Sequence, residues 1–100
     1  MKPITAARQP KSEDVESKSV LRRAAIRDVL DACSKKAVQL RPDAPDNVRW
    51  AALAFDLDVS IHTVQHWARK GYIPKSSAVA LARRYGAKLV RVEDVSTHQI

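Results

Sequence analysis

Apolar residues in the middle of the chain recur at spacings of three and four, which is the spacing of one face of an α-helix. In the first such segment they are Val48, Ala51, Ala52, Ala54 and Phe55. Asp58 then tolerates the left-handed backbone of a tight turn, and Ser60 can cap the next helix by accepting a backbone N–H. A second helix is predicted over about residues 61–70, since Gly71 commonly follows a helix end and Pro74 blocks continuation. The pattern therefore predicts two short helices joined by a tight turn.

A longer apolar stripe precedes this pair of helices. It consists of Leu21, Ala25, Val29 and Cys33 at four-residue spacing, widened by Ile26, Leu30, Ala37 and Val38. The stripe predicts a helix of roughly five turns, which we place at residues 17–38. Its apolar face could cover a small core or support a dimer, and the sequence leaves both open. Residues 1–16 mix prolines, polar groups and charges, which predicts a disordered leader.

Turn residues and a further apolar pattern flank the paired helices. The segment RPDAPDN is a turn by its Pro and Asp content, and Asp46 or Asn47 can cap the helix that follows. Residues 74–85 place Ala78, Val79, Ala82 and Tyr85 on one face, and Gly86 stops the pattern, which predicts a fourth helix.

The last part of the chain alternates apolar and polar residues. From Lys88 to Val95 this alternation predicts a short strand or an extended tail packed on the helices. We therefore expect an all-α fold of four helices in one domain, residues 17–86, between the leader and an extended C-terminal tail of residues 87–100.

Basic side chains concentrate in the part of the chain that is predicted to fold. The formal net charge is +7 over 100 residues. Residues 47–86 hold six basic against two acidic side chains, and residues 18–46 hold seven against four, whereas both ends are neutral. This distribution favours a polyanionic partner, because Lys and Arg beside phosphates release condensed counterions.

The polar side chains of the helix at residues 61–70 match what a reader of the DNA major groove needs. Val64 and Trp67 are three apart and can face the core, which turns hydrogen-bonding groups outward. Candidate base contacts are Ser60, His62, Thr63, Gln65 and His66, and candidate phosphate contacts are Arg49, Arg69, Lys70 and Lys75. A polar outer face is also common on any soluble helix, so this list alone does not decide the function.

The run LAFDLDVSIHTVQHWARKGYIP resembles the helix-turn-helix of phage-type Cro and repressor regulators, particularly the short YdaS-like proteins. The positions that carry the resemblance are Ala54, Asp58, Val59, Ser60, Val64, Trp67, Gly71, Ile73 and Pro74. Two departures are that Asp58 replaces the usual turn glycine and that Trp50 stands where a glutamine often touches a phosphate. The resemblance implies a Cro-like transcriptional regulator of bacterial or prophage origin, usually a repressor, that binds double-stranded DNA as a homodimer.

Two other binding functions remain open from the sequence. The segment HTVQHWARKGYIP with the later VRVEDV also resembles excisionase and MerR-type winged-helix proteins, although residues 76–84 have helical spacing where a wing would begin. An antitoxin or adaptor that binds another regulatory protein is the alternative without DNA.

Catalysis and metal binding are not expected. His62 and His66 are four apart, but no nearby acidic or cysteine ligand completes a metal shell, and His98 lies near the chain end. Two glycines cannot form a phosphate-binding loop, and Asp56 is expected to be a capping or solvated group. We predict no enzyme activity and no cofactor.

The compartment is predicted from the single cysteine and the apolar runs. Cys33 alone cannot form an intramolecular disulfide, and no run is long enough to cross a bilayer. We expect a cytoplasmic protein without a membrane partner, associated with the nucleoid if it binds DNA.

Overall fold

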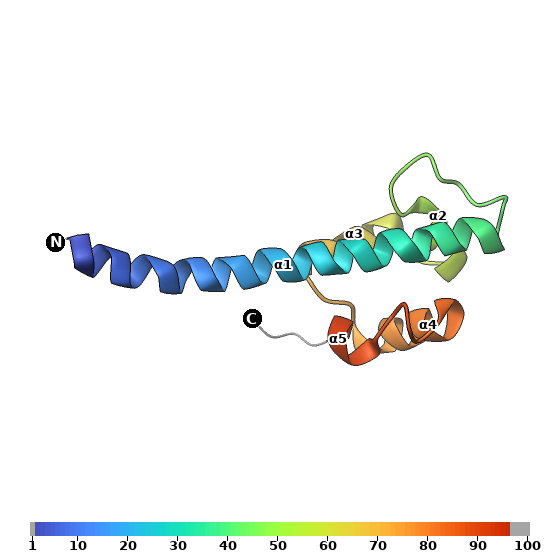
Figure 1. Cartoon of the computed structure of the whole chain (residues 1–100). Coiled ribbons are helices and arrows are strands. Elements are labelled where there is room, and N and C mark those ends of the chain that lie inside the picture. Colours follow the sequence, from blue (N-terminus) through green and yellow to red (C-terminus); the bar gives the residue numbers. More distant parts are fainter. Residues whose placement is uncertain (1, 97–100) are drawn as a thin grey trace.

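The computed structural model describes residues 2–96, with side-chain surroundings from residue 20 onward, and its regular structure there is entirely helical. The helices are α1 (Lys2–Leu40), α2 (Ala51–Leu57), α3 (Ile61–Lys70), α4 (Lys75–Tyr85) and α5 (Val92–Ser96). The long helix α1 packs against both α2 and α3, and α4 packs against α5 (Figure 1). The all-α prediction is confirmed.

The turn between α2 and α3 has the predicted local chemistry. Asp58 adopts the left-handed region, with φ 59° and ψ 45°. The Ser60 hydroxyl accepts a hydrogen bond from the backbone N–H of His62 at 3.0 Å. At the other end of α3, Gly71 has φ 82°, and a Cβ there would lie 3.1 Å from Cγ of Arg23. Glycine therefore serves both the left-handed helix end and the close approach of α1.

One apolar core joins α1 to the other helices. Helix α1 contributes Ile26, Leu30, Cys33 and Ala37, and the remaining elements contribute large residues such as Leu53, Trp67, Ile73, Leu81 and Val90. Burial raises the pKa of the Cys33 thiol to about 12, so the group remains an uncharged core residue. The exposed Leu21 and Ala25 show that the buried stripe is rotated from the predicted one.

The N-terminal leader differs from the sequence prediction. We predicted disorder over residues 1–16, but the structure continues α1 back to Lys2, and residue 1 lies outside the described residues. Extending an existing helix costs less than nucleating a new one, and Pro3 lies in the first turn, where a missing N–H is tolerated, whereas Pro10 in the helix interior removes one backbone donor. This part of α1 projects beyond the other helices (Figure 1).

The C-terminal prediction of a strand or extended tail is wrong for residues 92–96. They form α5, in which the backbone N–H groups of Asp94 and Val95 both donate to the carbonyl oxygen of Arg91. A lone strand would leave its backbone groups without a partner strand, whereas a helical turn satisfies them locally. The backbone N–H of Ile73 donates to the Val95 carbonyl at 2.8 Å, which ties α5 to the linker before α4. Residues 97–100 lie outside the described residues.

The start of α2 also differs from the prediction. Neither Asp46 nor Asn47 caps it, because the helix begins only at Ala51, after Trp50 in the left-handed region with φ 68°. Trp50 is buried, and its indole N–H donates to Asp31 of α1 at 2.8 Å. Burying a tryptophan ring offsets the cost of about 1–2 kcal/mol for left-handed backbone.

Candidate functional site

Helix α3 is fixed at both ends and along one face. Ser60 caps its start and Gly71 ends it, while Val64, Trp67 and Ala68 are buried against the core. The opposite face therefore has a defined orientation, since a helix whose buried residues are locked cannot rotate about its axis.

The outermost positions on α3 are two histidines and two cations. His62, His66, Arg69 and Lys70 are all exposed. Within residues 20–96, no hydrogen bond or ion pair engages their side chains. Neutral imidazole offers one donor and one acceptor, and Arg and Lys offer only donors, so this face can contact both bases and phosphates.

The other three predicted base contacts are either half-buried or already hydrogen-bonded within the protein. Ser60 is exposed, but its oxygen already accepts the capping hydrogen bond, which leaves the hydroxyl proton free to donate. Thr63 and Gln65 are half-buried. Gln65 lines a hollow between α3 and α1 together with Trp50, rather than lying opposite the core as the sequence predicted. The physical reason is that α1 covers the flank of α3 on which position 65 falls.

All four predicted phosphate contacts are exposed cations, but only three of them lack a partner within residues 20–96. Arg69 and Lys70 occupy the last turn of α3, where positive charge complements the helix dipole, and Lys75 opens α4. Arg49 is engaged instead. Its guanidinium makes two hydrogen bonds to the Asp31 carboxylate, at 3.0 and 2.8 Å, and lies over the ring of Trp50. A phosphate would therefore compete with Asp31 for the Arg49 guanidinium.

Two arginines of α1 extend the basic surface beside α3. Arg23 and Arg27 line the same hollow as Gln65 and Arg69. The sequence shows that they are four apart and therefore share a helix face, but it does not show that this face meets α3. They are additional candidate site residues that the sequence analysis did not assign.

A carboxylate that the sequence analysis treated as a capping or solvated group fixes α2 against α4. The side chain of Asp56 is only 1% exposed and accepts two hydrogen bonds from Arg84, both at 2.9 Å, and one from the Tyr85 hydroxyl. The guanidinium of Arg41 lies 3.7 Å away. The hydrogen bonds from Arg84 lower the pKa of Asp56 below its usual range, against the opposing effect of burial. Asp56 is therefore a structural anion and not part of the exposed face.

The described residues contain neither a candidate metal cluster nor a candidate membrane-spanning helix. No three His, Cys, Asp or Glu side chains there come together as a candidate metal site, and His98 lies outside that part of the chain. No helix there is both long enough and apolar enough for a bilayer span.

No protein-family model matches the chain, and no curated protein or solved structure matches it significantly.

Proposed function

We propose that this protein is a sequence-specific DNA-binding regulator of transcription, in which α2 and α3 form a helix-turn-helix and α3 enters the major groove. The observation that carries the proposal is the unengaged face of α3, with His62, His66, Arg69 and Lys70 on a helix anchored by buried Trp67. A recognition helix needs this combination of a locked inner face and free polar groups outside.

Base reading would fall mainly to His62 and His66. They are one turn apart, so both can meet base edges along the same groove, where each imidazole can donate or accept. The hydroxyls of Ser60 and Thr63 lie at the start of α3, the end that contacts bases in helix-turn-helix proteins. Gln65 contributes from the flank that faces α1.

Phosphate contacts would come from Arg69, Lys70 and Lys75, with Arg23 and Arg27 of α1 on the other side of the hollow. These cations surround one end of α3. Contacts of this kind supply the salt-dependent, sequence-independent part of DNA affinity.

The resemblance to Cro and repressor proteins supports the same proposal. It further implies that the protein comes from a bacterium or a prophage and represses transcription by occupying a promoter. The winged-helix alternative lacks support in residues 2–96, because they contain no strand and residues 76–84 belong to α4. A protein-binding adaptor would use the same exposed face without DNA, and it is the alternative outcome of the test.

Selection of bound duplexes from a random DNA library tests the proposal. We expect the parent protein to enrich one sequence motif, and a His62→Ala/His66→Ala variant to lose that enrichment while still binding DNA through its cations. Failure of the folded parent protein to enrich any motif would reject sequence-specific recognition.

A further inference from the structure

A hollow between α1 and α3 is lined by basic, amide and apolar side chains. We call it the α1–α3 hollow and define it by Arg23, Arg27, Trp50, Gln65, Ala68 and Arg69. None of the described residues that line it is acidic. Its volume is about 340 Å³, and sites for small ligands have volumes of about 300–1,000 Å³. The hollow therefore has the size of a site for a small group.

Two arginines bring guanidinium groups to this hollow from two different helices, Arg27 from α1 and Arg69 from α3. Within residues 20–96, neither side chain makes a hydrogen bond or an ion pair. Arg27 is half-buried, so its charge has lost part of its hydration without gaining an anion in exchange. The hollow thus holds positive charge that the described part of the chain does not neutralise.

The packing of α1 against α3 fixes the place of these arginines. At Gly71, which ends α3, a Cβ would lie 3.1 Å from Cγ of Arg23, so α1 and the end of α3 are in contact there. Arg27 follows Arg23 by about one helical turn and shares its face of α1. Trp50 and Ala68 are buried and supply the apolar surface of the hollow. The site is therefore built by packed elements and exists without a ligand.

The carboxylate that contacts Trp50 is already paired. Asp31 accepts a hydrogen bond from the Trp50 indole at 2.8 Å and two from Arg49, at 3.0 and 2.8 Å. Asp31 is therefore committed to these donors and is not the counter-ion of the α1–α3 hollow.

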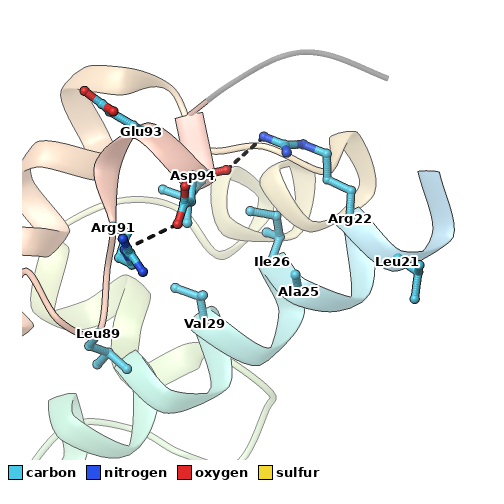
Figure 2. Close-up of a pocket in the computed structure, with 10 residues that line it drawn as sticks. Leu21, Arg22, Ala25, Ile26, Val29, Leu89, Arg91, Glu93 and Asp94 are labelled. Atoms are coloured by element: carbon cyan, nitrogen blue, oxygen red, sulfur yellow. Dashed lines mark hydrogen bonds and ion pairs between the residues drawn. The ribbon is translucent and has the colours of Figure 1, made fainter. Parts of the chain in front are cut away.

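A second hollow on α1 shows what a compensated site looks like. Figure 2 shows it between α1 and the segment that carries α5, with acidic and basic side chains around it. Arg22 donates to the carbonyl oxygen of Asp94 at 3.0 Å, and Arg91 lies 3.4 Å from the Asp94 carboxylate. The cations there have partners within the chain, so this second hollow serves as an internal comparison.

We propose that the α1–α3 hollow binds a single phosphate group, held between Arg27 and Arg69 with the Gln65 amide as a third donor. A phosphate monoester carries about −1.5 to −2 charges at neutral pH and three acceptor oxygens. These oxygens match two guanidiniums and an amide that belong to two helices. A carboxylate has only two oxygens in one plane, which one guanidinium already satisfies.

The phosphate group can come from two sources, a DNA strand that lies beside α3 or a free phosphate ester. The first source rests on the proposed function, whereas the second does not. The site is therefore testable in the absence of DNA.

Titration of the full chain with inorganic phosphate, followed by NMR of the arginine side chains, tests the proposal. At constant ionic strength we expect saturable shifts at Arg27 and Arg69 with a dissociation constant of about 1 mM. Arg91, at the second hollow, should not shift. Acetate should bind at least about tenfold more weakly than phosphate, and equal binding of the two anions would contradict a phosphate site.

Two variants each remove one guanidinium and keep a polar side chain. Arg27→Gln and Arg69→Gln should each raise the dissociation constant for phosphate at least about tenfold, because a charge-assisted contact is lost. Arg83→Gln is the matched control, since Arg83 is exposed in the last turn of α4 and its loss removes the same charge elsewhere. Backbone amide spectra verify that each variant is folded. Shifts that do not saturate, or an equal loss of affinity in Arg83→Gln, would overturn the proposal.

Addition of a random-sequence duplex to the phosphate-bound protein distinguishes the two sources. Displacement of phosphate from Arg27 would assign the hollow to a DNA strand, and DNA binding that leaves phosphate in place would assign it to a free phosphate ester. A parent chain that binds phosphate saturably but binds no duplex would reject the proposed function and leave the phosphate site standing.

Discussion

Individual charged residues in this protein divide into those that the fold uses and those that it leaves exposed. The Asp31 carboxylate accepts hydrogen bonds from the guanidinium of Arg49 and from the indole of Trp50. The Asp56 carboxylate accepts them in the same way from Arg84 and from the Tyr85 hydroxyl. In both carboxyls the arginine hydrogen bonds are the main cause of a lowered pKa. The cations of α3, by contrast, have no partner among residues 20–96.

The Asp56 carboxylate should make the fold sensitive to acid. Its pKa in the folded protein lies below the ordinary value of 3.8, so the unfolded chain takes up the proton more readily. The stabilisation is therefore complete above about pH 4 and is lost as the pH falls through 3.8 toward the folded value. Melting temperatures of the parent should fall over this acid range, and those of Asp56→Asn should fall less steeply.

At neutral pH, Asp56→Asn should lower the free energy of unfolding by about 1–3 kcal/mol, because the buried carboxylate loses its charge-assisted hydrogen bonds from the exposed Arg84 and from Tyr85. Asp43→Asn is the control, since Asp43 is exposed and lies 3.9 Å from Arg41. Equal stability of both variants at neutral and acid pH would contradict the assigned role of Asp56. Urea denaturation measured by circular dichroism gives the comparison.

His66 and Gln65 are adjacent in sequence but differ in exposure, and they should differ in their effect on DNA binding. His66 is exposed, whereas Gln65 is half-buried beside α1. His66→Ala should weaken binding to the selected site by about 1–3 kcal/mol and leave random DNA nearly unaffected. Gln65→Ala should have the smaller effect on the selected site. The reverse order in fluorescence anisotropy titrations would mean that α3 presents its α1-facing flank to the bases.

At the scale of helices, sequence signals at the two helix ends predicted α3 correctly. The features that the sequence did not predict depend on contacts between residues that are far apart in the chain. The bounds of α3 match the prediction because Ser60 and Gly71 act on their own neighbours. The engagement of Arg49 and Trp50 by Asp31 could not be predicted, because these residues are 18 and 19 positions away from it. The same holds for α5, whose Val95 carbonyl bonds to the linker before α4.

Trp67 should contribute most of the anchoring of α3. It is buried with Val64 and Ala68, and Trp67→Ala should lower the free energy of unfolding by about 3–5 kcal/mol, as for other large core truncations. Phe55→Ala is the control, because Phe55 is 41% exposed and should cost only about 1 kcal/mol. Similar losses for the two variants in thermal melting would mean that α3 is rotated about its axis.

At the scale of the whole molecule, α1 organises two separate surfaces. One flank carries Arg23 and Arg27 beside α3, and the opposite flank carries Ala25 and Val29, which line a hollow together with Leu89. A basic flank and an apolar flank are thus built on one helix. The apolar stripe in the sequence includes both core residues and residues of this hollow. The spacing alone therefore could not distinguish residues that pack in the core from residues that could support a dimer.

The salt dependence of DNA binding, measured by fluorescence anisotropy with cognate and random duplexes, tests the proposed DNA-binding function most directly. We expect the affinity of the parent to fall steeply as salt rises. Arg69→Ala/Lys75→Ala should weaken both duplexes alike and flatten the slope of log affinity against log salt by about two units. Arg83→Ala/Lys88→Ala removes the same charge from two exposed positions, one in the last turn of α4 and one in the turn after it, and should retain the parent slope. An unchanged slope after the first double substitution would remove these residues from the interface, and a parent protein without salt-sensitive DNA binding would contradict the proposed function itself.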